Sequence, residues 1–139
     1  MRLSEDTCRA RLVPARRGVL ATRPVDRGPD LVPVCFVVDR EHLAVPVDTV
    51  KEKSSTDLAR RRNLDRDHRA SLLVDHWDED WSQLWWVRAR LELDATPTPR
   101  LVRDLDEGLR AKYPPYLGTV FADVLVFVVT ELSGWSASS

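Results

Sequence analysis

Apolar side chains occupy every second position between Trp85 and Leu93, namely Trp85, Val87, Ala89, Leu91 and Leu93. The positions between them are polar except Trp86. A period of two places them on one face of a strand and leaves the other face to water. Segment 124–130, Val-Leu-Val-Phe-Val-Val-Thr, is apolar at odd-numbered and even-numbered positions up to Val129, so both faces of a strand there would be apolar. It predicts a strand that is central in its sheet or covered by a partner.

Four further segments have the composition of strands. They are 18–22, 31–38, 42–47 and 70–75, and turn-forming stretches separate most of them. The first three form two consecutive hairpins, which favours an antiparallel sheet. Pro33 and Pro46 lie inside these strands, where an edge strand or a bulge would accommodate each proline. A ladder gap at Pro33 could also free neighbouring main-chain groups to contact a flat heterocycle.

Three segments carry helix signals. Ser4, followed by Glu5 and Asp6, starts a helix that should stop before Pro14. A run of serine and threonine at 54–56 precedes a charged helix that reaches about Asp65. Thr98-Pro99 opens a third helix, which ends at Tyr113 and has one apolar face, so it should lie on the sheet.

Six strands interrupted by three short helices do not follow the alternating rhythm of a parallel sheet. The pattern predicts a mainly β domain with minor α content, a six-stranded antiparallel split β-barrel with flanking helices. A chain of 139 residues has the length of one domain, here 1–135, and 136–139 reads as a disordered tail. So short a barrel closes imperfectly, and a second copy of the chain is the simplest cover for its edges.

Composition narrows the classes of function. The 21 basic and 22 acidic residues give a net charge of -1, so we expect no nucleic acid partner. The ordinary content of apolar and charged residues indicates a globular chain without membrane association. The first residues turn acidic at once and lack the apolar run of a secretory signal. Together with only two cysteines, without metal-site spacing, this predicts a cytoplasmic protein.

A basic segment offers the most pointed candidate for ligand binding. Lys51 and Lys53 stand just before the second predicted helix, which itself carries Arg60. Two ammonium groups beside a helix N-terminus, where amide hydrogens are free, could clamp a phosphate. The acidic residues Glu52 and Asp57 are interleaved with these cations, so a solvated charged face is the alternative interpretation.

Four tryptophans crowd into the segment 77–86. Trp85 is expected in the core and dimer interface, whereas Trp77 and Trp81 lie in an acidic loop, where apolar rings call for a ligand or partner. The acids and histidine of this loop are weak evidence for a metal, and no metal site is predicted. The sequence contains no recognisable catalytic triad and no glycine-rich phosphate motif.

Several stretches, taken in order, resemble the pyridoxamine 5′-phosphate oxidase-like superfamily, and most closely its deazaflavin branch, which uses coenzyme F-420. The stretches lie between Gly18 and about Ala89. They are Val19 to Thr22, Leu31 to Val37, the pair Lys51 and Lys53, Leu64 to Asp67, Leu72 to Trp81, and Leu84 to Arg88.

The resemblance implies a homodimer of the FMN-binding split-barrel type, with two cofactor sites at the subunit interface. The strand holding Val32, Pro33 and Val34 would run along the cofactor ring. Lys51 and Lys53 would hold the cofactor phosphate. Arg60, on the helix that follows, is also expected to bind the cofactor. The loop holding Trp77 and Trp81 would approach the site from the partner subunit. Glu52 departs from the family pattern, in which a proline tends to stand between the two lysines.

The function so implied is an oxidoreductase that uses coenzyme F-420 for hydride transfer to or from a small conjugated organic substrate. Such a protein must chiefly fix the ring and exclude water, so no catalytic residue is predicted. Two alternatives stay open. One is an FMN-dependent enzyme of the pyridoxamine 5′-phosphate oxidase type, and the other is a non-catalytic module that binds flavin or haem.

Overall fold

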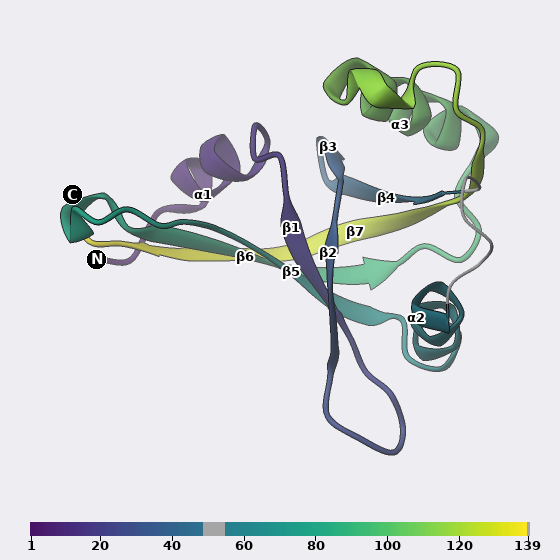
Figure 1. Ribbon diagram of the computed structural model, residues 1–139, viewed down its shortest axis with the longest axis horizontal. Helices are drawn as coiled ribbons and strands as arrows, with labels where there is room; N and C mark the ends of the chain where they lie inside the picture. Colours follow the sequence, from purple (N-terminus) through teal and green to yellow (C-terminus); the bar gives the residue numbers. More distant parts are fainter. Residues whose placement is uncertain (49–54, 139) are drawn as a thin grey trace.

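The computed structural model describes residues 1–48 and 55–138. Within these ranges, seven strands form one antiparallel sheet in the order β2-β1-β5-β6-β7-β4-β3, curled into a half-barrel (Figure 1). The strands are β1 (Gly18–Thr22), β2 (Asp30–Val34), β3 (Val37–Asp39), β4 (His42–Asp48), β5 (Arg69–His76), β6 (Trp85–Leu93) and β7 (Phe121–Ser136). The helices are α1 (Glu5–Leu12), α2 (Ser55–Arg66) and α3 (Pro99–Lys112), with 3-10 turns η1 (Trp81–Gln83) and η2 (Pro114–Tyr116). The predicted split-barrel fold with flanking helices is confirmed.

The sheet has one strand more than predicted, because the segment 31–38 divides at Cys35 and Phe36. β2 pairs with β1, whereas β3 pairs with β4 at the opposite end of the strand order. One continuous strand could not pair with both ends of the sheet. The chain passes from Val34 to Val37 within about 11 Å, the reach of three residues. The two edges of the half-barrel therefore lie close together at Phe36.

A tyrosine hydroxyl secures this crossing. Phe36 is fully buried, and its main-chain N–H donates to Tyr113 Oη at 3.2 Å. The same hydroxyl donates to the carbonyl of Arg16, just before β1, at 2.8 Å. Lys112 Nζ lies 4.1 Å from the Phe36 ring centroid, and burial lowers the pKa of this lysine to about 8. The end of α3 thus joins the entry to β1 and the crossing between sheet edges.

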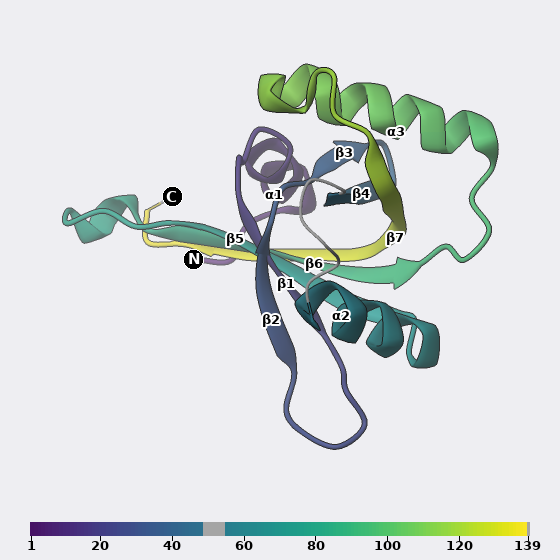
Figure 2. The same ribbon diagram turned by 45° about the vertical axis from the view of Figure 1, so that its right-hand side comes forward.

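Both faces of the apolar segment 124–129 of β7 are buried or half-buried, as its sequence predicts. Leu125 and Phe127 point into the barrel core, where they join the buried side chains of β6. Val126 points the other way and packs with Ala44 and Leu105 beneath α3. Figure 2 shows α3 lying across this outer face of β4 and β7. The alternation predicted for 85–94 is also confirmed, with the odd-numbered positions turned inward.

The predicted helix caps are confirmed where the structure describes them. Ser4 Oγ accepts from the Thr7 amide at 3.2 Å, and Thr98 Oγ1 accepts from the Leu101 amide at 3.2 Å. β2 is an edge strand, which accommodates Pro33. β7 includes Ser136, one residue beyond the predicted domain boundary, and the Met1 amino group donates to the Ser136 carbonyl. No described helix combines the length and apolar character needed to cross a membrane.

Gly134 in β7 gives a direct test of how α1 packs on the sheet. A Cβ at this position would meet the Trp86 carbonyl oxygen at 2.7 Å and Cys8 Sγ at 3.0 Å. We expect Gly134→Ala to lower the free energy of unfolding by about 1–3 kcal/mol, because the neighbouring main chain must shift. Gly28→Ala is the matched control, since nothing lies within 4 Å of its Cβ. Urea unfolding should show a change within about 0.5 kcal/mol for the control; equal changes in both variants would contradict this packing.

Candidate functional site

A basic pocket lies where α2 meets the hairpin of β1 and β2. We call it the α2 pocket; it measures about 410 Å³ and is lined by Arg27, Asp30, Leu31, Val32, Ala59, Arg60 and Arg62. Its lining includes three arginines and one aspartate. Arg60 is only 6% exposed, which fixes its position within the fold. Such a pocket suits a phosphate or another small anion.

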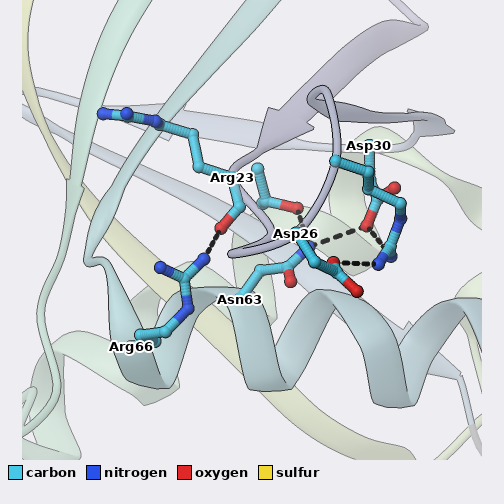
Figure 3. A network of polar contacts seen from close by, with 7 residues as sticks. Arg23, Asp26, Asp30, Asn63 and Arg66 are labelled. Atoms are coloured by element: carbon cyan, nitrogen blue, oxygen red, sulfur yellow. Dashed lines mark hydrogen bonds and ion pairs between the residues drawn. The ribbon is translucent and has the colours of Figure 1, made fainter.

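A buried asparagine sets the position of α2 against the hairpin. Asn63 Nδ2 donates to Thr22 Oγ1 at the end of β1, at 3.0 Å, and to Asp30 Oδ2 at the start of β2, at 2.8 Å. Figure 3 shows this amide between the two strands, with Arg66 donating to the Arg23 carbonyl one turn further along the helix. Since Arg60 precedes Asn63 by one helical turn, this anchor also orients Arg60 into the pocket.

The carboxylate of Asp30 connects the anchor to the pocket wall. It accepts from Asn63 and from Arg27 Nη2, the latter at 2.9 Å. The hydrogen bond from Asn63 is the largest cause that lowers the pKa of Asp30 below its usual range, and Arg27 adds to it. Arg27 also pairs with Asp26 at 3.0 Å. Arg27 is thus held by two carboxylates in the pocket wall.

The residues predicted for cofactor binding on β2 and α2 are only partly brought together. Val32 and Arg60 line the α2 pocket. Pro33 is exposed on the outer face of the sheet, whereas the Val34 side chain is buried in the core, where it can offer no side-chain contact. Only main-chain groups of Pro33 and Val34 could therefore follow a ring along this edge. Lys51 and Lys53 lie outside the described residues.

The predicted aromatic residues lie in a different part of the molecule. A second pocket, which we call the tryptophan pocket, has a volume of about 390 Å³. It is lined by Leu73, Asp75, His76, Trp77, Leu84, Trp85, Trp86, Arg88 and Trp135. The tip of the hairpin of β5 and β6 lies at the far left of Figures 1 and 2, away from α2. Within one chain, Trp77 and the α2 pocket therefore stand apart.

The loop at the tip of this hairpin is ordered by its own acidic residues. Asp80 accepts from the Ser82 amide at 3.1 Å, and Asp78 accepts from the Asp80 amide at 2.8 Å. The rings of Trp77 and Trp81 meet edge to face, with centroids 6.3 Å apart, yet they are 63% and 66% exposed. Among residues 1–48 and 55–138, no group of three histidine, cysteine or acidic side chains is placed to hold a metal ion.

An apolar groove of about 930 Å³ covers the outer face of β1, β5 and β6. Its apolar walls include Val19, Leu31 and Leu73, and Leu31 and Leu73 are exposed. Arg88 lines both this groove and the tryptophan pocket. Its Nε atom is buried and finds no hydrogen-bond partner in the described part of the chain. An exposed apolar face around an unpaired donor is typical of a surface that another molecule covers.

Sequence reasoning missed part of both pockets. Arg27 and Asp30 belong to the turn-rich stretch after β1, whose composition indicates only a loop. Asn63 stands among charged helix residues, and its buried position follows from the approach of the hairpin rather than from a local pattern. Trp135 lines the tryptophan pocket because β7 continues past Thr130 as the partner strand of β6.

Solved structures of flavin-binding proteins share this fold. An FAD-binding protein from Mesorhizobium loti is 19% identical, with a TM-score of 0.69, over 96% of this chain and 93% of its own. The FAD binding protein from Mycobacterium smegmatis is 18% identical, with a TM-score of 0.64 and 97% coverage of each chain. A candidate pyridoxamine 5′-phosphate oxidase from Corynebacterium glutamicum is 17% identical, with a TM-score of 0.61 and 98% coverage of each chain.

These likenesses identify the architecture as the split β-barrel found in flavin-binding proteins. At such identities they define the fold alone. No family model matches the chain, and no curated protein matches its sequence.

The anchoring role of Asn63 predicts a coupled change in stability and acid titration. Asn63→Ala should lower the free energy of unfolding by about 1–3 kcal/mol, because Thr22 and Asp30 lose a buried donor. The pKa of Asp30 should rise towards 3.8, its ordinary value, since Asn63 is the main cause of its depression. A carboxyl with a depressed pKa stabilises the fold above pH 3.8, and this contribution is lost as the pH falls. Carbon-detected NMR titration of Asp30 checks the shift, and an unchanged pKa in the variant would contradict this assignment.

Proposed function

We propose that this protein is an oxidoreductase of the pyridoxamine 5′-phosphate oxidase-like superfamily that binds coenzyme F-420, with FMN as the alternative cofactor. The observation that carries the proposal is the α2 pocket, a fixed basic site at the open edge of a flavin-type split barrel. The resemblance of the sequence motifs favours the deazaflavin over FMN. Both coenzymes combine a phosphate with a flat tricyclic ring, so the same site suits either.

The residues at the phosphate end fit such a cofactor. Arg60 and Arg62 supply guanidinium groups, which match phosphate oxygens in geometry as well as in charge. Lys53 stands two positions before Ser55, the first residue of α2, so the predicted clamp and the pocket belong to one stretch of the chain. In this arrangement Asp30 holds Arg27 in the pocket wall.

Along the proposed cofactor ring, the β2 residues would make contact through main-chain groups. β2 is the edge of the sheet, and Pro33 exposes its flank, so a flat ring can lie against the strand without displacing a neighbouring strand. The exposed Leu31 side chain offers an apolar surface. When bound, a deazaflavin supplies or accepts a hydride at its central ring. The chain itself binds and orients the ring and excludes water; a small conjugated substrate is the class we expect.

A second copy of the chain completes the proposed site. The exposed rings of Trp77 and Trp81 stand apart from the α2 pocket of their own chain, so they can reach a cofactor there only from a partner. The apolar groove on β1, β5 and β6 is the surface we propose for the homodimer, and Arg88 Nε would find an acceptor in it. The free cysteines Cys8 and Cys35 suit a reducing compartment, which supports a cytoplasmic location.

The decisive experiment is a comparison of cofactors. The purified protein is titrated with coenzyme F-420 and with FMN, and each equilibrium is followed by absorbance and calorimetry. Tighter binding of coenzyme F-420 supports the proposal, tighter binding of FMN supports the FMN-dependent alternative, and binding of neither overturns both. If bound F-420 is neither reduced nor oxidised across a panel of enones, quinones and tetrapyrroles, the protein is a non-catalytic binding module.

The basic clamp predicts a loss of affinity on substitution. Lys53→Ala should weaken cofactor binding by about 1.5–3 kcal/mol, the range for one charge-assisted hydrogen bond. Arg100→Ala, at an exposed position near the start of α3, is the control and should leave affinity unchanged. Calorimetry of the cofactor with each variant measures the effect, with circular dichroism as a check of the fold. Wild-type affinity in Lys53→Ala would remove this lysine from the site.

The groove predicts where the dimer is vulnerable. Leu73→Glu places a charge at an exposed leucine of the groove lining and should weaken self-association by about 2 kcal/mol or more. Leu117→Glu is the control, because Leu117 is equally apolar, is exposed, and lies outside the groove. Sedimentation velocity over a range of concentrations separates the two. A dimer that survives Leu73→Glu unchanged, or a wild-type monomer, would rule out this interface.

A further inference from the structure

A third pocket gathers arginines around the end of α1. It measures about 350 Å³ and lies between the segment that links α1 to β1 and the hairpin of β5 and β6. Its lining comprises Arg11, Pro14, Ala15, Arg16, Arg17, Asp75 and Trp85. It shares no residue with the α2 pocket. In Figure 1, α1 lies at the upper left of the molecule and α2 at the lower right.

Arg11 is held in this pocket with an unused donor. Its guanidinium carbon lies 5.2 Å from the ring centroid of Trp85, so the indole supports the charged group from one side. The Nη1 atom is buried and has no hydrogen-bond partner in residues 1–48 and 55–138. Buried nitrogen donors nearly always have an acceptor, because leaving one unpaired is costly. The fold thus fixes a guanidinium beside a pocket that lacks its acceptor.

The charge of the pocket defines that acceptor as an anion. Its lining includes three arginines and the single carboxylate of Asp75. Arg16 is restrained as well, since its guanidinium carbon lies 4.9 Å from the Tyr113 ring centroid. The lining therefore has more basic than acidic side chains, and its apolar wall is made by Pro14, Ala15 and Trp85. A planar guanidinium binds a carboxylate through two parallel hydrogen bonds.

We propose that this pocket binds a small aromatic acid, with the carboxylate on Arg11 and its arginine neighbours and the ring against the apolar wall. Guanidinium groups and an apolar surface at the same opening recognise those two parts of one ligand. Neither part needs the α2 pocket or a cofactor. The pocket shares Asp75 and Trp85 with the tryptophan pocket, but its test does not depend on cofactor binding.

The test uses 2-naphthoate as the probe and 2-naphthamide as its neutral counterpart. Each is titrated into the protein as purified, and binding is measured by calorimetry and by the NMR shift of the Trp85 indole N–H. The expected result is that the carboxylate binds at least about tenfold more tightly than the amide, the difference made by one charge-assisted hydrogen bond. Equal affinities, or no binding of 2-naphthoate, would overturn the proposal.

Substitutions locate the probe. Arg11→Met should weaken 2-naphthoate binding by about tenfold or more, and Arg103→Met, on the exposed face of α3, should leave it unchanged. Arg17→Met, at an exposed position of the same pocket, gives a second measurement should Arg11→Met disturb α1. Wild-type affinity in both pocket variants would show that the probe binds elsewhere and would overturn the assignment.

Discussion

The half-barrel depends on the bond between the Phe36 amide and the Tyr113 hydroxyl. At this point the chain leaves one edge of the sheet and joins the other, and a crossing strand has no ladder partner for its buried amide. Tyr113 supplies that partner from outside the sheet and passes its own hydrogen to Arg16. One hydroxyl therefore ties α3, β1 and both sheet edges together. Without it, the fold would bury an unpaired donor at its seam.

The opposite end of the half-barrel is organised by Asn63. Its amide joins α2 to the end of β1 and the start of β2. The shape of the α2 pocket therefore depends on the hairpin as well as on the helix. Arg60 and Asp30 owe their positions to this anchor. The α2 pocket and the tryptophan pocket lie far apart on one curled sheet, and the groove between them is apolar. A second copy that covers the groove would bring the two kinds of pocket to one interface.

Local patterns predicted the elements well because each carries its own signal. The alternation at 85–94 and the double apolar face of 124–130 correspond to β6 and the covered part of β7, and Ser4 and Thr98 cap their helices as expected. The division at Phe36 has no such signal, because 31–38 is a continuous apolar run. Likewise, Arg27, Asp30 and Asn63 meet only through tertiary contact, and no spacing along the chain indicates it. Val32 and Val34 are the same residue type, and their positions in the sheet decide that Val34 is buried in the core whereas Val32 lines the α2 pocket.

The crossing at Phe36 is also where the two edge strands of the half-barrel, β2 and β3, are joined. β2 pairs only with β1, and β3 only with β4, in the part of the chain that the structure describes. No ladder bonds between described residues join the two edges, so a widening of the gap between them would break none. In the proposed complex, the split barrel would then accept cofactor rings of different width without losing ladder hydrogen bonds. Selectivity among coenzymes would depend on the charged end of the coenzyme.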